Sequence, residues 1–205
     1  KIIRDYSAFK LVKQPETVTE NVNGVKKKFT RLTGLIQKAD TPNENGRVYP
    51  SSVMKEAIEA LKEPISARMV LGELDHPDDA KIHTENACIL LTKVWMEGID
   101  VYGQFEILEG MPKGQMLKSL IDQGVTISIS SRGVGDMEVV IREDGSELNE
   151  VLPGFRFVCF DAVNEPSVKG TALSMMESRQ RNKNIVERRR NHEKKLERVL
   201  NSSLI

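Results

Sequence analysis

Short apolar stretches alternate with segments rich in glycine, proline and charged side chains along most of the chain. Several of these stretches alternate apolar with polar positions or are rich in β-branched residues, which is the pattern of strands. Two of them are joined by the turn-like residues 97–100, which predicts a hairpin. The strand-like stretches are residues 29–37, 68–74, 85–95, 101–108, 125–131, 139–142 and 155–160.

Two other segments repeat their apolar residues at helical spacing. Residues 53–61 are predicted to form a helix with Ser51 or Ser52 as its N-cap, and residues 112–123 a second helix that ends at Gly124. Six or seven strands with two helices between them predict a β-rich α+β domain, either a barrel or a sandwich.

Charge is distributed unevenly, although 30 basic and 30 acidic residues give a net charge of zero. Residues 179–198 hold nine Lys and Arg but three Glu, a net charge of +6, so the remainder carries −6. This tail has no glycine or proline and can therefore be helical. Its apolar positions are too sparse for a buried stripe, which leaves either a solvated tail or a basic arm that docks on an acidic partner or nucleic acid.

The composition excludes several classes of protein. A chain of 205 residues with 39% hydrophobic and 29% charged residues is expected to fold in water. No stretch approaches eighteen apolar residues, and the first residues do not resemble a signal peptide, so we expect no membrane association. Cys88 and Cys159 are too few for a disulfide framework, which favours buried thiols in a reducing compartment. The neutral total argues against a wholly basic nucleic-acid binder.

Three histidines are available for chemistry, and His76 has the most suggestive surroundings. It lies between Asp75 and Pro77 at the end of an apolar stretch, where a neighbouring carboxylate could fix its tautomer and allow it to act as a general base. A histidine in a surface turn explains the same pattern. His83 has no evident partner in the sequence, and His192 lies in the basic tail.

Three serines lie on or next to a β-branched stretch at residues 127–135, where each buried hydroxyl needs a partner. Strand alternation places Ser130 and Arg132 on one face and Ser131 on the other. The glycines that follow, Gly133 and Gly135, would let the chain turn and expose backbone amides that could bind an oxyanion. A polar strand end followed by a glycine turn is the simpler interpretation. The Gly-x-Ser-x-Gly elbow and the phosphate-binding loop are both missing.

Asp161 ends the apolar stretch 155–160, where a carboxylate without a partner would be costly. It could accept a hydrogen bond from a histidine and orient the ring, or simply cap the turn before Pro166. Dispersed histidines and two distant cysteines give no metal-ligand spacing, so we expect neither a metal nor a cofactor.

In their order along the chain, these motifs resemble the prohead core proteases of T-even-like bacteriophages. The resemblance covers about residues 35–167 and does not extend to the flanks. It rests on Gly-Glu-Leu-Asp-His-Pro at residues 72–77, Asp-Val-Tyr-Gly at 100–103, Ser-Ser-Arg-Gly-Val-Gly at 130–135, Asp-Ala-Val-x-x-Pro-Ser at 161–167, and Arg-Val-Tyr-Pro at 47–50.

The resemblance implies a serine endopeptidase with a fold like the herpesvirus assemblins, an irregular β-barrel surrounded by helices. His76 then matches the base and Ser130 the nucleophile, with Ser131 as a competing nucleophile. Assemblins have a histidine as third member, whereas this chain offers Asp161, with His83 and Glu73 as rivals. Backbone amides near residues 131–133 would bind the oxyanion, and Arg132 or Lys169 would add positive charge.

The resemblance also implies partners and a location. Such enzymes cleave scaffold and core proteins, the major capsid protein and themselves inside the prohead, in the host cytoplasm. They cut after Glu, so we expect self-cleavage after Glu187. A homo-oligomer is compatible with the sequence, and nucleic acid is a less favoured partner because the tail lacks interleaved aromatic residues. An inactive structural component of the prohead is the alternative.

Three regions are expected from these arguments. Residues 1–28 form an N-terminal extension, residues 29–175 the protease domain, and residues 176–205 a basic helical tail.

Overall fold

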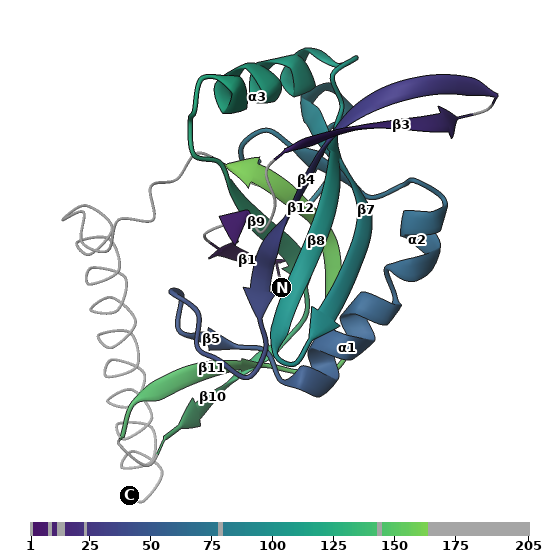
Figure 1. The fold of residues 1–205 in the computed structure, drawn as a ribbon. Helices are drawn as coiled ribbons and strands as arrows, with labels where there is room; N and C mark the ends of the chain where they lie inside the picture. The colour runs from purple at the N-terminus through teal and green to yellow at the C-terminus, as the bar shows by residue number, and fades with distance from the viewer. Residues whose placement is uncertain are drawn as a thin grey trace, which may run out of the picture. The chain divides into compact units, whose positions relative to one another are not determined.

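The computed structural model describes residues 2–7, 10–11, 15–22, 24–77, 80–142 and 145–163 (Figure 1). These residues form mostly β-sheet with few helices, which confirms the β-rich prediction. The strands are β1 Ile2–Ser7, β2 Lys10–Leu11, β3 Glu16–Val22, β4 Val25–Lys38, β5 Arg47–Val48, β6 Leu71–Glu73, β7 Ala87–Glu97, β8 Asp100–Ile107, β9 Ser128–Val134, β10 Met137–Ile141, β11 Glu147–Val151 and β12 Arg156–Val163. The helices are α1 Ser51–Glu59, α2 Lys62–Ser66 and α3 Pro112–Asp122, with a 3-10 turn at Thr84–Asn86.

The strands form three sheets. The largest has the order β2-β4-β8-β7-β6, with β3 also paired to β4. A second sheet has the order β1-β9-β12, and a third has β10-β11-β5. A parallel bridge between Leu74 and Ala162 joins the chain just after β6 to β12, so the first two sheets meet at this point.

The hydrophobic core draws on the first two sheets and on the helices. Phe105 of β8 packs edge-on against Phe160 of β12, with ring centroids 6.1 Å apart. Helix α1 contributes Val53, Met54 and Ala57, which share one buried face as the helical spacing predicts. The residues that pack here therefore come from distant parts of the chain and hold β12 against the large sheet.

Most local predictions from the sequence are confirmed, with shifted ends. The β7–β8 hairpin turns at Gly98, whose φ of 62° favours glycine, and α3 is followed by Gly124 at φ 79°. The N-cap of α1 is Pro50 and makes no side-chain cap bond, so the prediction of a serine cap was wrong. Ser51 instead donates its backbone N–H to the Asp40 carboxylate at 2.7 Å.

The N-terminal residues are part of the β-structure, although the sequence suggested only an extension. Strand β1 pairs antiparallel with β9, and its Ile3 and Asp5 are buried. The expected boundary between residues 28 and 29 falls inside β4. Residues 1–165 form one compact unit. The predicted basic helical tail lies outside the described residues.

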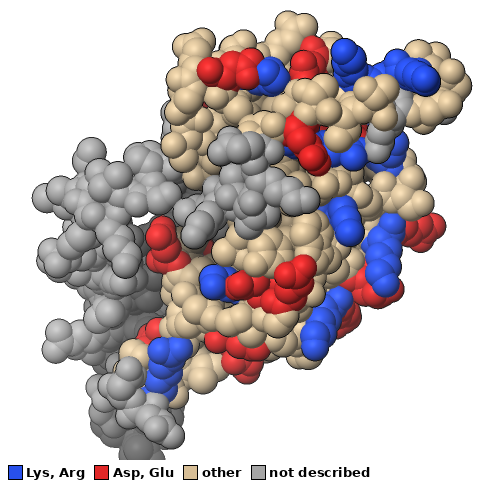
Figure 2. Space-filling model, viewed as in Figure 1, with Lys and Arg blue, Asp and Glu red and all other residues tan. Residues whose placement is uncertain are grey.

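Acidic and basic side chains are mixed over the face of the molecule seen in Figure 2, with no large area of one sign among the described residues. None of the helices within the described ranges is long and apolar enough to cross a membrane.

Candidate active site

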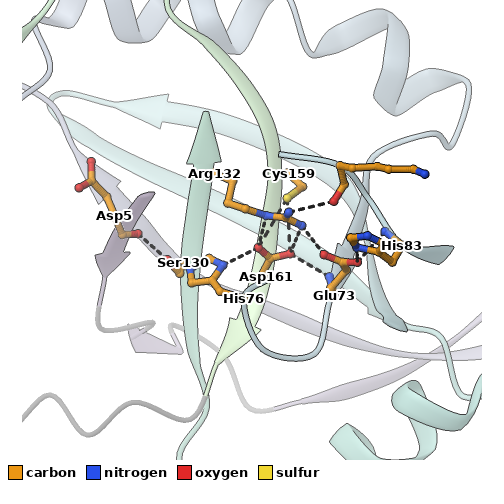
Figure 3. Close-up of polar contacts among 9 residues, drawn as sticks. Asp5, Glu73, His76, His83, Ser130, Arg132, Cys159 and Asp161 are labelled. Carbon is orange, nitrogen blue, oxygen red and sulfur yellow. Dashed lines mark hydrogen bonds and ion pairs between the residues drawn. The ribbon is translucent and has the colours of Figure 1, made fainter. Parts of the chain in front are cut away.

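Three predicted site residues come together in one hydrogen-bonded chain (Figure 3). His76 Nε2 lies 2.5 Å from Ser130 Oγ, and His76 Nδ1 lies 2.7 Å from Asp161 Oδ2. Ser130 and Asp161 are fully buried, and the His76 side chain is 8% exposed. These residues are 31 to 85 positions apart in the sequence, so only the fold brings them together.

The second sheet places Ser130 and Asp161 side by side. They are direct partners across the antiparallel β9–β12 pair, and directly opposed side chains point to the same face. His76 follows β6, where Asp75 has a φ of 66° and donates its N–H to Ala162 O at 2.9 Å. This left-handed turn against β12 brings the imidazole to the other two side chains.

The Asp161 carboxylate is ionised. Burial by itself raises the pKa of Asp161, but hydrogen bonds from His76, Arg132 and the Glu73 amide outweigh burial and hold it below its ordinary value. An ionised carboxylate only accepts hydrogen bonds, so His76 Nδ1 carries the hydrogen that lies toward Asp161. Nε2 is then free of hydrogen in the neutral ring and can accept from the Ser130 hydroxyl.

Arg132 lies behind Asp161, which differs from its expected place at the oxyanion. Its guanidinium is fully buried, with Nε 2.6 Å from Asp161 Oδ2 and Nη2 2.5 Å from Glu73 Oε2. Glu73 Oε1 in turn accepts the His83 N–H at 2.6 Å. Of the predicted rivals of Asp161, Glu73 therefore contacts Arg132 and His83 contacts Glu73, whereas Asp161 contacts His76 directly.

Two other predicted site residues also have different surroundings from those expected. Ser131 points to the opposite face of β9 and donates to Gln37 Oε1 at 3.2 Å, so the geometry favours Ser130 as the nucleophile. Of the two glycines expected to turn the chain, Gly133 lies within β9, which continues to Val134 with strands on both sides, whereas Gly135 lies between β9 and β10. A Cβ at Gly133 would lie 2.3 Å from Phe155 Cε2, so glycine is required there for packing. Lys169 lies outside the described residues.

A contact from β1 to the nucleophile was not foreseen. The Ser130 hydroxyl donates to the main-chain carbonyl of Asp5 at 2.8 Å. The Asp5 carboxylate is itself held by Arg47, Tyr49 and Asn45, the last at 2.9 Å. Burial raises the pKa of Tyr49, so it stays a phenol that can donate to Asp5. A backbone carbonyl leaves no signal in a sequence, because any residue could supply it.

The two cysteines are buried thiols, as the sequence predicted. Burial raises the pKa of Cys88 to about 12 and that of Cys159 further still, so neither is a thiolate at neutral pH. Cys159 Sγ instead donates weakly to Asp161 Oδ1 at 3.4 Å. Within the described part of the chain, His, Cys, Asp and Glu side chains form no group that could hold a metal ion.

A buried Ser–His–Asp chain on a β-sheet scaffold is the arrangement found in serine hydrolases. The chain belongs to the prohead core protein serine protease family, whose model matches residues 10–182. This confirms the resemblance noted from the motifs.

Two known proteins are similar to this chain. The prohead core protein protease of Enterobacteria phage T4 is 32% identical over 143 residues. The match covers 66% of this chain and 64% of the T4 protein, less than two thirds of the relative's length. The solved structure of the bacteriophage T4 capsid assembly protease has a TM-score of 0.69 and 25% identity, covering 80% of this chain and 97% of that one.

Proposed function

We propose that this protein is a serine endopeptidase of phage head maturation, with Ser130 as nucleophile, His76 as general base and Asp161 as the group that orients His76. The observation that carries the proposal is the position of His76, which reaches Ser130 Oγ with one ring nitrogen and Asp161 with the other. An ordinary buried histidine needs partners too, but a serine and an ionised carboxylate on opposite nitrogens are the arrangement that acyl transfer requires.

The proposed reaction has two steps. Ser130 Oγ attacks the scissile carbonyl carbon while its proton passes to His76 Nε2, and the imidazolium then protonates the leaving amine. Water attacks the acyl-enzyme with the same base, which releases the new carboxyl terminus and restores the serine. Asp161 stabilises the imidazolium in both steps because it stays ionised beside Nδ1.

The proposed substrates are prohead scaffold and core proteins, the major capsid protein and this chain itself, cleaved after Glu inside the prohead in the host cytoplasm. The names of the relatives support a protease that acts in the prohead core and in capsid assembly. We further propose that the architecture is related to the barrels of the herpesvirus assemblins. The predicted self-cleavage after Glu187 lies outside the described residues.

A catalytically inactive component of the prohead is the alternative, and one observation favours it. Ser130 is fully buried, and both edges of β9 are paired, with β1 and β12. A peptide carbonyl can therefore reach Ser130 only if a neighbouring segment moves.

Self-processing of the full chain separates the two functions. We expect Ser130→Ala and His76→Ala to abolish cleavage on a gel, whereas the matched control Ser131→Ala retains it. Intact-mass measurement of the wild type should show the loss of the residues after Glu187. If the Ser130 and His76 variants are processed like the wild type, the proposed mechanism is wrong, and a wild type that cleaves neither itself nor prohead proteins favours the structural alternative.

A further inference from the structure

A buried ionic group lies directly behind the proposed catalytic residues. Arg132 is wholly buried between two wholly buried carboxylates, those of Asp161 and Glu73 (Figure 3). Its Nη2 also contacts Asp161 Oδ1 at 3.1 Å, and its Nη1 donates to the Lys81 carbonyl at 3.1 Å. Buried ion pairs of this kind add little net stability compared with apolar side chains of the same volume, so stability alone does not account for them.

The contacts converge on one carboxylate oxygen. Asp161 Oδ2 accepts both from His76 Nδ1 and from Arg132 Nε. The planar guanidinium binds both Asp161 oxygens at once, which fixes the plane of the carboxylate and hence the direction of the bond to the imidazole. The Glu73 amide holds the second oxygen from the other side at 2.9 Å.

Glu73 has a second effect through its charge. An arginine paired with Asp161 alone would cancel the negative charge that faces His76. With the Glu73 carboxylate at 2.5 Å from Arg132 Nη2, the three side chains together carry a net charge of −1. A group of this sign favours the imidazolium that forms when the proton leaves Ser130.

We propose that Arg132 and Glu73 are positioning residues of the active site: Arg132 orients the Asp161 carboxylate toward His76, and Glu73 holds Arg132 and offsets its charge. Neither contacts the Ser130 hydroxyl in the described interactions. This inference rests on the proposed function, because it assigns both residues an effect that passes through Asp161.

The test measures the reactivity of Ser130 with a fluorophosphonate probe, in which Oγ attacks phosphorus, fluoride leaves and the hydroxyl proton passes to the base. The maximal labelling rate kinact and the half-saturating probe concentration are determined for full-length wild type, Arg132→Lys and Glu73→Gln. Lysine keeps the charge but cannot bind both Asp161 oxygens while reaching Glu73. We expect kinact to fall about 10- to 100-fold, as for displacements near 1 Å, with little change in half-saturation.

A double-mutant cycle distinguishes positioning from general damage. If Arg132 and Glu73 act through Asp161, each substitution lowers kinact by less than about twofold once Asp161→Asn is present. Arg31→Lys is the matched control, because Arg31 also pairs with a buried carboxylate, that of Glu106 at 2.8 Å, outside this group. Thermal unfolding of every variant checks that it is folded, and kinact of Arg31→Lys should stay at the wild-type value.

Four results would overturn the inference. Full and additive losses in the Asp161→Asn background, or losses no larger than that of Arg31→Lys, contradict it while leaving the proposed function intact. An Asp161→Asn single variant with wild-type kinact removes the role of Asp161 itself. If peptide mass spectrometry finds no probe on Ser130 of the wild type, both the proposed function and this inference are contradicted.

Discussion

The contact of β6 with β12 leaves no room for a side chain at residue 72, which makes Gly72→Ala a sharp test of how the site is assembled. A Cβ on Gly72 would lie 1.9 Å from the main-chain oxygen of Phe160 and 2.8 Å from Ile89 Cγ1. Real Cβ atoms are essentially never closer than 3.0 Å to such neighbours, so β6 and β12 must separate by at least about 1.1 Å. The oxygen belongs to backbone and cannot rotate away.

Two losses follow from this displacement. Overpacking of this kind costs about 1–3 kcal/mol of unfolding free energy, which for a domain of this size lowers Tm by about 2–12 °C. Because residue 73 donates to Asp161 and residue 76 follows on the same segment, a shift near 1 Å should also lower activity about 100-fold. Thermal unfolding by circular dichroism and the self-processing rate measure the two effects.

Gly110→Ala is the matched control, because nothing lies within 4 Å of a Cβ at that position and its φ is not in the left-handed region. It should unfold and process like the wild type. A Gly72→Ala variant with a Tm within 1 °C of the wild type and an unchanged processing rate would refute the packing argument. A Tm difference of 1 °C corresponds to about a third of a kcal/mol of unfolding free energy.

Three further predictions concern stability and reactivity. The pKa of Asp161 is lowered in the folded state, so its ionised form stabilises the fold above its ordinary pKa, and this stabilisation is lost as the pH falls. The Tm difference between wild type and Asp161→Asn should therefore be larger at pH 7 than in acid. A difference that does not change with pH would contradict this prediction. Cys88, with a pKa of about 12 and no exposure, should resist iodoacetamide in the native protein and react after denaturation, as measured by intact mass. Rapid labelling of the native protein would contradict this prediction and would show that the region around Cys88 opens readily. Phe105→Ala removes a fully buried ring that packs on Phe160 and should cost about 3–5 kcal/mol in urea unfolding, whereas a loss below 1 kcal/mol would mean that the core closes around the gap.

The sequence pattern predicted the elements that depend on residues close together in the chain. Strands β7 and β8 with their Gly98 turn, and helix α3 with Gly124 after it, were all visible as short-range periodicity. Strand β1 was missed because its partner β9 lies more than 120 positions away, and β11 was missed because its sequence Glu-Leu-Asn-Glu-Val is mostly polar. Such strands form because they pair with residues far away in the sequence, and a window of neighbouring residues carries no information about that pairing.

The candidate site shows the same division. Motif order pointed to His76, Ser130 and Asp161, and the fold brings these three together. The surroundings of Arg132 could not be predicted, because strand alternation gives the face of a side chain but not the carboxylates that meet it from other strands. Gly133 lies within β9 and not in a turn for a related reason: its lack of a side chain makes room for Phe155, which immediately precedes β12, the strand paired with β9.

The Ser130 hydroxyl has a single hydrogen and two acceptors within reach, His76 Nε2 at 2.5 Å and the Asp5 carbonyl at 2.8 Å. When the hydrogen lies toward Asp5, the oxygen has no route for its proton to the imidazole, and attack cannot begin. When it lies toward Nε2, the Asp5 carbonyl loses its donor. The first strand of the chain thus competes with the base for one proton, and rotation about a single Cβ–Oγ bond separates the two arrangements.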